Sequence, residues 1–201
     1  MDHDLTSGTP DATPLDDGDL DGLIPAWVAT RSDLDAAEQA NIEQAALWAF
    51  GRRRVVADPA ELLTVPFANR VHRRMFGDVW RWAGTFRQRI TNIGVEPYLI
   101  PQSLRDALDD ATYWHRNDVF GATEIAVRLH HRVVTVHPYP NGNGRHSRFM
   151  ADLYLHVNGM GRLEWGGGRL EETGTLRAAY VAALREADAG SYESLIRFAA
   201  G

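Results

Sequence analysis

The chain has 201 residues, of which 44% are hydrophobic and 24% charged, and its formal net charge is −6. This length and composition predict one domain with a substantial core, and the negative charge gives no overall attraction for nucleic acid. The sequence contains neither Lys nor Cys, which excludes a catalytic lysine, a Walker-type phosphate lysine, disulfides and thiolate chemistry. We find no membrane-spanning run and no signal peptide, so the sequence predicts a soluble, cytoplasmic protein.

The N-terminal part of the chain changes character near residue 23. Residues 1–22 are rich in Asp, Gly, Pro and Thr, and this composition predicts a disordered acidic tail. Thr30 or Ser32 can cap a helix over about 33–52. We therefore assign residues 23–59 to an N-terminal helical segment.

The remaining residues, 60–201, predict an all-α domain that carries one short β-hairpin. Phe67, Val71 and Met75 recur at helical spacing and predict a core-facing stripe. Residues 85–101 are rich in strand-type side chains around a turn, which predicts the hairpin. Further helices are expected over about 101–115, 123–136, 145–157, 171–187 and 191–199.

The stretch with the clearest chemistry is "HPYPNGNGRHSR", residues 137–148. The proline after His137 disfavours helical geometry, so the imidazole should lie where a helix ends and a loop begins. A histidine in such a place can act as a general base near neutral pH. Gly142 and Gly144 precede a new helix, and they can expose backbone N–H groups in a concave anion site.

Two arginines follow the glycines at the start of that helix. Arg145 and Arg148 are three residues apart, so both should lie on one face of the first turn. Cations there cost roughly a few tenths of a kcal/mol against the helix dipole, whereas a bound phosphate would make them favourable. The pattern predicts a base, His137, beside a phosphate donor, with a target hydroxyl attacking phosphorus.

This stretch resembles the signature of the Fic/Doc family, roughly H-P-F-x-[D/E]-G-N-G-R-x-x-R, with Tyr139 in place of the usual Phe. The segment "DVWRWAGTFR", residues 78–87, is similar to the W-A-G-x-x-R segment that precedes the β-hairpin flap of that family. The core resemblance covers about residues 60–160. Nearly all of the ordered chain also resembles a subfamily called mobile mystery protein B, whose members carry "NGNGR" in this loop and lie beside a helix-turn-helix partner gene.

The resemblance implies a Fic-type helical fold with a β-hairpin flap and the activity of a protein adenylyltransferase, which moves AMP from ATP to a target hydroxyl. It implies that His137 is the base, that Gly142, Asn143 and Gly144 bind the donor phosphates, and that Arg145 and Arg148 bind the distal phosphates. Pro138 and Tyr139 would support the loop. Residues 88–98 would form the flap that aligns a target segment.

The implied partners are a protein with a Ser, Thr or Tyr hydroxyl, docked on the flap, and a helix-turn-helix, antitoxin-like protein of a bacterial toxin–antitoxin pair. No membrane and no direct nucleic-acid partner are expected. Two alternatives stay open. The protein could be a nucleotide- or phosphate-binding regulatory module without catalysis, or a Fic enzyme with another phosphate-containing donor.

The loop departs from the family pattern at Asn141, where Asp or Glu usually holds Mg²⁺. Because Mg²⁺ prefers carboxylates together with phosphate oxygens, three interpretations remain open. Asn141 ligates Mg²⁺ weakly while ATP phosphates hold it, or the site uses another donor or no metal, or the protein binds a nucleotide without catalysis. The presence of His137 argues against the third, since a pure binder needs no base.

Many Fic proteins are inhibited by a glutamate in an [S/T]-x-x-x-E-[G/N] helix that pairs with the second motif arginine. The nearest match here is Glu38 in "LDAAEQAN", where Leu34 replaces Ser or Thr. The resemblance implies a pair between Glu38 and Arg148, and the competing interpretation is a solvated glutamate. His130 and His131 are adjacent and lack zinc-ligand spacing, so we expect no zinc site.

Overall fold

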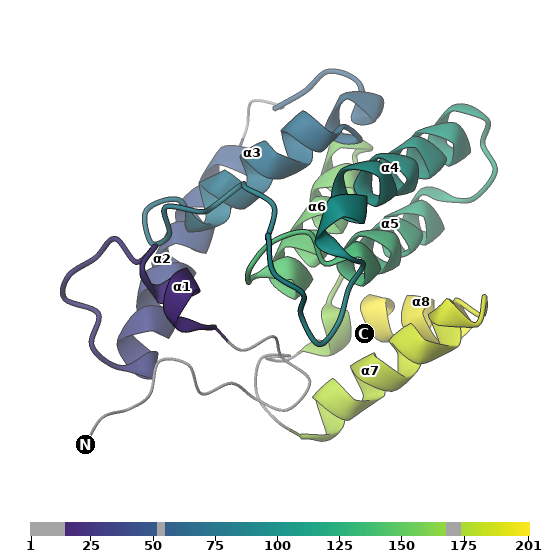
Figure 1. Cartoon of the computed structure of the whole chain (residues 1–201). Coiled ribbons are helices and arrows are strands. Elements are labelled where there is room, and N and C mark those ends of the chain that lie inside the picture. Colours follow the sequence, from purple (N-terminus) through teal and green to yellow (C-terminus); the bar gives the residue numbers. More distant parts are fainter. Residues whose placement is uncertain (1–14, 52–54, 168–173) are drawn as a thin grey trace.

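The computed structural model describes residues 15–51, 55–167 and 174–201, and these residues form a helical bundle (Figure 1). The predicted all-α architecture is confirmed. The helices are α1 (Asp17–Leu20), α2 (Arg31–Ala49), α3 (Val65–Phe76), α4 (Ile100–Arg116), α5 (Ala122–Val136), α6 (Asn143–Val157), α7 (Thr175–Asp188) and α8 (Glu193–Ala200), with short 3-10 turns η1 (Pro59–Leu62), η2 (Pro97–Leu99) and η3 (Trp165–Gly167).

Side-chain caps explain where the first long helices begin. Thr30 accepts a hydrogen bond from the backbone N–H of Asp33, whose carboxylate in turn accepts from the N–H of Thr30, a capping box that starts α2. Asp58 caps η1 in the same reciprocal way, with Pro59 in its first position. The predicted start of α2, at about residue 33, is therefore close to the observed one.

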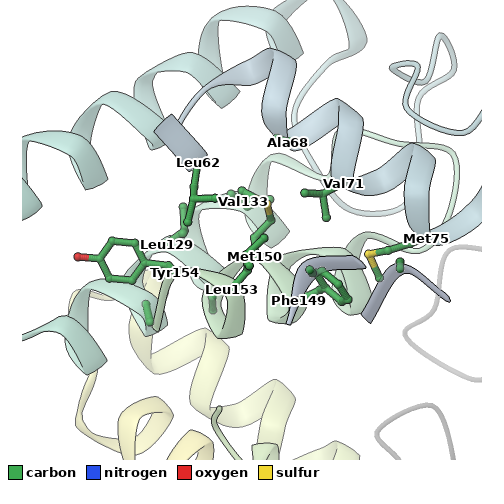
Figure 2. Packing of buried hydrophobic residues seen from close by; sticks show 14 of the residues in the cluster. Leu62, Ala68, Val71, Met75, Leu129, Val133, Phe149, Met150, Leu153 and Tyr154 are labelled. Carbon is green, nitrogen blue, oxygen red and sulfur yellow. The ribbon is translucent and has the colours of Figure 1, made fainter. Parts of the chain in front are cut away.

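The core lies where α5 and α6 pack against each other, with α4 on α5, and with α3 and then α2 on the side of α6. Figure 2 shows α3 residues facing α5 and α6 residues across this core. The predicted stripe Phe67, Val71 and Met75 is buried. Burying each such side chain contributes about 1.5–3 kcal/mol, so this packing holds the α5–α6 junction, and the loop within it, in place.

The β-hairpin predicted over residues 85–101 does not form, because the part of the chain that the structure describes contains no strand in this region. The backbone of this stretch bonds to another part of the molecule. Arg87 donates its N–H to the carbonyl of Pro138 at 3.0 Å, and Val95 donates to Val136 at 3.3 Å. In Figure 1 this stretch is the teal chain that follows α3 and crosses to the α5–α6 junction before α4.

Residues 15–22 also differ from the predicted tail, because they include helix α1 and the buried Leu15. The reason is the carboxylate of Asp19, which completes a capping box and forms an ion pair with Arg89 at 2.5 Å. Residues 1–14, the rest of the predicted tail, lie outside the described residues.

The other predicted helices are present with shifted ends. The helix expected over 171–187 is observed as α7 from Thr175, and residues 171–173 lie outside the described part. The helix expected from Arg145 begins earlier, at Asn143. No helix in the described ranges has the length and apolar character needed to cross a membrane.

Candidate active site

The loop between α5 and α6, residues 137–142, begins and ends with a residue in the left-handed backbone region. His137 ends α5 with φ 54° and ψ 59°, and Gly142 precedes α6 with φ 77°. A positive φ is uncommon for a residue with a side chain, and it marks a position that its surroundings must hold. At Gly142 a side chain has no room, because a Cβ atom would lie 2.6 Å from the ring of Phe76.

Asn143 braces this loop from inside. Its side-chain carbonyl accepts the N–H of Tyr139 at 2.9 Å, and its amide donates to the carbonyl of Tyr139 at 2.8 Å. The side chain is buried. The expected contact with donor phosphates can therefore come only from the backbone of Asn143, since both ends of the amide already hold the loop.

Beneath the loop, Tyr139 is fully buried, as expected for loop support, and its hydroxyl donates to Asn69 at 2.9 Å. Its ring stacks on His72, with ring centroids 3.8 Å apart. Nδ1 of His72 accepts the N–H of Gly84 at 3.0 Å, so Nε2 carries the proton and donates to the carbonyl of Asn141 at 3.1 Å. His72 thus joins the "WAG" segment to the motif loop.

This role of His72, which is followed by two arginines on α3, was not predicted from the sequence. The only available signal was its position next to Val71 on the apolar side of α3. Burial holds the pKa of His72 well below its usual value, assisted by the nearby His146. The ring is therefore neutral at pH 7 and acts as a hydrogen-bonded spacer rather than a cation.

The imidazole of His137 is only 6% exposed. Burial, assisted by the positive charges of Arg87 and Arg89, lowers the pKa of His137 to about 4, whereas a bond to the backbone of Val134 opposes the shift. At neutral pH the ring is uncharged. It can therefore accept a proton from an attacking hydroxyl, the role expected of a general base.

The two motif arginines turn to different neighbours. The guanidinium of Arg145 lies over the ring of Phe76 and forms an ion pair with Glu38 at 2.7 Å. The guanidinium of Arg148 lies 5.9 Å from the ring centroid of Tyr180. The expectation that both arginines serve one face of the anion site therefore holds only if Arg145 leaves Glu38.

Glu38 itself differs from both sequence interpretations. It is buried rather than solvated, and it pairs with Arg145 rather than with Arg148. Its second carboxylate oxygen accepts the indole N–H of Trp80 at 2.6 Å. The rigid indole holds the carboxylate toward α6, and this long-range contact explains why local sequence spacing assigned the wrong arginine.

Asn141 is a poor protein ligand for Mg²⁺ in this arrangement. Its side-chain oxygen accepts the N–H of the next residue, Gly142, at 2.5 Å. Among the described residues no group of three or more His, Asp or Glu side chains could hold a metal ion. The residues present therefore do not form a protein-held Mg²⁺ site, and no step below depends on one.

A hollow of about 860 Å³ lies between α2 and α3, lined by residues such as Trp48, Arg70 and Arg74. It contains no residue of the motif loop. Size alone would favour this groove as a binding site, but the buried base and the backbone N–H groups of the loop lie elsewhere. We therefore place the candidate active site at the loop.

Comparison with known proteins identifies this arrangement. Residues 62–155 match the model of the Fic/DOC family. This range includes the "WAG" segment, the flap segment and the whole loop with both arginines. The chain therefore carries a Fic/DOC family domain over these residues. The resemblance to the mobile mystery protein B subfamily stays a prediction.

Two named relatives match the sequence of this chain over part of its length. A uridine 5'-monophosphate transferase of Xanthomonas campestris is 32% identical over 71 residues, which is 31% of this chain and 13% of that protein. Protein adenylyltransferase fic-1 of Caenorhabditis elegans is 28% identical over 134 residues, 65% of this chain and 25% of its own length. The chain thus spans about a quarter or less of these relatives.

Solved structures share the fold at lower identity. The N-terminal Fic domain of Bep8 from Bartonella sp. 1-1C has a TM-score of 0.65 at 12% identity, over 86% of this chain and 85% of that one. Fic-1 of Caenorhabditis elegans gives 0.62 at 22% identity, over 89% and 50%. BepC of Bartonella tribocorum, solved with bound AMPPNP, gives 0.63 at 13%, over 85% and 86%. At these identities the likeness shows the fold alone.

Proposed function

We propose that this protein transfers a nucleoside monophosphate, preferably AMP from ATP, to a Ser, Thr or Tyr hydroxyl of a target protein. The observation that carries the proposal is the arrangement at the two ends of the loop. A buried, neutral His137 lies at one end, and the N-terminus of α6 begins at the other. The relatives named adenylyltransferases support this reaction type.

In the proposed reaction the target hydroxyl gives its proton to the imidazole of His137 as its oxygen attacks the α-phosphorus of the donor. A new O–P bond forms, and the bond from that phosphorus to the oxygen bridging the α- and β-phosphates breaks. The electron pair leaves with pyrophosphate. Backbone N–H groups of Asn143 and Gly144, together with the α6 dipole, offset the charge on the phosphates. The N–H of Gly142 can join them only when it leaves the side chain of Asn141.

Two features make the choice of donor open to test. The uridine 5'-monophosphate transferase relative makes UTP a specific second candidate. The amide of Asn141 also replaces a carboxylate, so Mg²⁺ would have to reach the loop on the phosphates of the donor. We propose ATP as donor with donor-borne Mg²⁺, and the comparison of nucleotides below decides between donors.

We further propose that Glu38 restrains the site by holding Arg145 away from the donor phosphates, so that Arg145 joins Arg148 on them only when the ion pair opens. The carboxylate of Glu38 is buried and Arg145 is partly buried, and breaking the pair leaves a carboxylate that still has the indole of Trp80. A helix-turn-helix, antitoxin-like partner remains a proposal from the resemblance alone.

The test incubates the protein and a bacterial lysate with each nucleoside triphosphate, labelled at the α- or the γ-phosphate, with Mg²⁺ or with EDTA. The variants are His137→Ala, Glu38→Gln and Asn141→Asp. We expect α-label on protein, lost by about 10²–10⁴-fold in His137→Ala and increased in Glu38→Gln.

Label from the γ-phosphate alone would replace the proposal with phosphoryl transfer. If no variant transfers label while nucleotide binding is equal in wild type and His137→Ala, the binding-module alternative is correct. Unchanged labelling by Glu38→Gln would end the proposed restraint but leave the transfer reaction standing.

A further inference from the structure

Arg87 is a buried arginine whose guanidinium donates to three backbone carbonyl groups at and near His137. Its Nε donates to the carbonyl of His137 itself at 2.7 Å. Nη1 donates to the carbonyl of Arg89 at 2.8 Å, and Nη2 donates to the carbonyl of Val95. One planar guanidinium thus joins the base to two points in the flap segment, residues 88–98, which lie six residues apart in the chain.

The bonds of Arg87 replace the cross-strand bonds that the flap segment lacks. A hairpin would hold residues 89 and 95 together through its own ladder, but here both carbonyls point at one side chain. Arg87 also donates its backbone N–H to Pro138 at 3.0 Å. Arg87 therefore fastens the flap segment over the loop, together with the backbone bond from Val95 to Val136, while Arg89 pairs with Asp19 of α1.

Gly94 shows how closely the flap segment lies on the base. A Cβ atom at this position would be 2.5 Å from the Cβ of His137 and 2.7 Å from Nη2 of Arg87. Gly94 also has a φ of 100°, which side chains rarely adopt. The flap backbone, the guanidinium and the base therefore touch, so a movement of one must be accommodated by the other two.

A purely structural role would not need a charge at residue 87. Burying a cation against neutral carbonyls costs more than burying an apolar side chain of similar volume. The desolvation also lowers the pKa of Arg87, which Arg89 lowers further and Glu96 raises. The positive charge of Arg87 lies near His137, where it favours the neutral imidazole that a general base needs.

We propose that Arg87 is a positioning residue that holds the base His137 and both ends of the flap segment in one geometry. It sets the distance between the base and whatever target backbone docks on the flap. This role rests on the proposed transferase function. It is not a contact with substrate, because the structure directs all the bonds of Arg87 toward the protein itself.

The first experiment measures the protein without turnover. Histidine ring signals are followed by NMR from pH 3.5 to 8 in wild type, Arg87→Gln and Arg87→Lys, with His137→Ala to assign the signal of residue 137. We expect Arg87→Gln to raise the pKa of His137 by about one unit. Arg87→Lys keeps the charge and should raise it by less. The charged neighbours Arg89 and Glu96 stay in place in both variants.

Hydrogen exchange gives a second readout that does not depend on activity. Both variants should speed amide exchange in residues 89–95 at least about tenfold relative to α5 and α6, because neither replacement can reach all three carbonyls. Arg105→Lys, an exposed arginine on α4, is the matched control and should change neither the exchange nor the titration.

The activity readout separates positioning from binding. In Arg87→Lys, kcat should fall about 10–100-fold, while the dissociation constant for ATP stays within about twofold. An Arg87→Lys protein that stays folded and shows wild-type flap exchange, with an unshifted His137 pKa in Arg87→Gln, would overturn the proposal. If wild type transfers no nucleotide, the proposed function fails, but titration and exchange still decide the role of Arg87.

Discussion

The motif loop, residues 137–142, and the flap segment, residues 88–98, touch each other but are held in different ways. The loop is held by buried side chains from other elements, among them His72 from α3 and Asn143 from α6. The flap segment is largely exposed, and the buried side chain of Arg87 bonds to it at two carbonyl groups. The difference indicates which part must be rigid and which part must adapt.

The proposed function explains this division. In the proposed reaction a base and a donor would have to meet within a fraction of an ångström, which fits a loop around His137 that is pinned by satisfied, buried polar groups. A target segment would come from another protein and would have to enter and leave. The segment that would receive it benefits from exposed backbone and few fixed contacts. The following variants test the comparison, from the largest expected effect to the smallest.

Asn143→Ala should have the largest effect. It leaves the buried N–H and C=O of Tyr139 without their partner, which should lower the free energy of unfolding by about 2–4 kcal/mol. Urea unfolding measures this loss. Asn117→Ala is the control, because Asn117 makes one exposed bond at the end of α4, and it should cost below about 1 kcal/mol. Equal losses would mean that Asn143 does not pin the loop.

Acid should weaken the loop side of the structure first. Burial lowers the pKa values of His137 and His146 to about 4, from the ordinary 6.5. Between pH 6.5 and 4 the unfolded chain binds protons that the folded one does not, so stability falls as the pH falls through this window, by about 3 kcal/mol per histidine.

The variant His146→Gln tests this sign. It removes one titrating ring and keeps a donor for the carbonyl of Ala68. The slope of the unfolding free energy against pH reports how many more protons the unfolded chain binds than the folded one. Between pH 4 and 6.5 this number should fall by up to one, and above pH 7.5 the slope should not change. An unchanged slope would show that His146 is not buried in its neutral form.

Substitutions at two glycines, Gly142 in the motif loop and Gly94 in the flap segment, compare the two regions directly. In Gly142→Ala the new methyl group meets the ring of Phe76 in a pinned loop at a φ of 77°, which should cost about 2–3 kcal/mol of stability. In Gly94→Ala the clash with His137 is equally close, but the exposed flap can shift. We expect a stability loss below about 1 kcal/mol together with a fall in transfer activity. A large stability loss in Gly94→Ala would refute the contrast.

Tyr98→Ala should have the smallest effect on stability. The side chain is 77% exposed at the end of the flap segment, so the unfolding free energy should change by less than about 0.5 kcal/mol. If the flap receives the target, the KM for target protein should rise while the affinity for ATP does not. Tyr113→Ala, 61% exposed on α4, is the matched control. Equal effects of both variants on KM would place target docking elsewhere.

Local patterns predicted the helical frame well because their causes are local. The capping box at Thr30 and the apolar spacing of Phe67, Val71 and Met75 act within a few residues. The proline after His137 and the glycine at residue 142 likewise placed the loop between two helices. The expected hairpin failed because strand-type side chains do not ensure a partner strand.

The supporting residues could not be predicted because their partners are far away in the chain. His72 bonds Asn141 across 69 positions, and Arg145 meets Glu38 across 107. No spacing rule connects such pairs. Arg87 stood inside a recognised segment, but its role became visible only once the carbonyls of residues 89, 95 and 137 converged on it.

The sequence by itself therefore determined most of the helices, the position of the loop and the candidate base, since backbone preference and residue chemistry are local properties. Only the tertiary structure decided which arginine Glu38 holds, that Asn143 serves the loop, and that the flap segment is fastened by Arg87. Burial is the physical reason. A buried polar group must find a partner wherever packing brings one, and packing is a property of the whole chain.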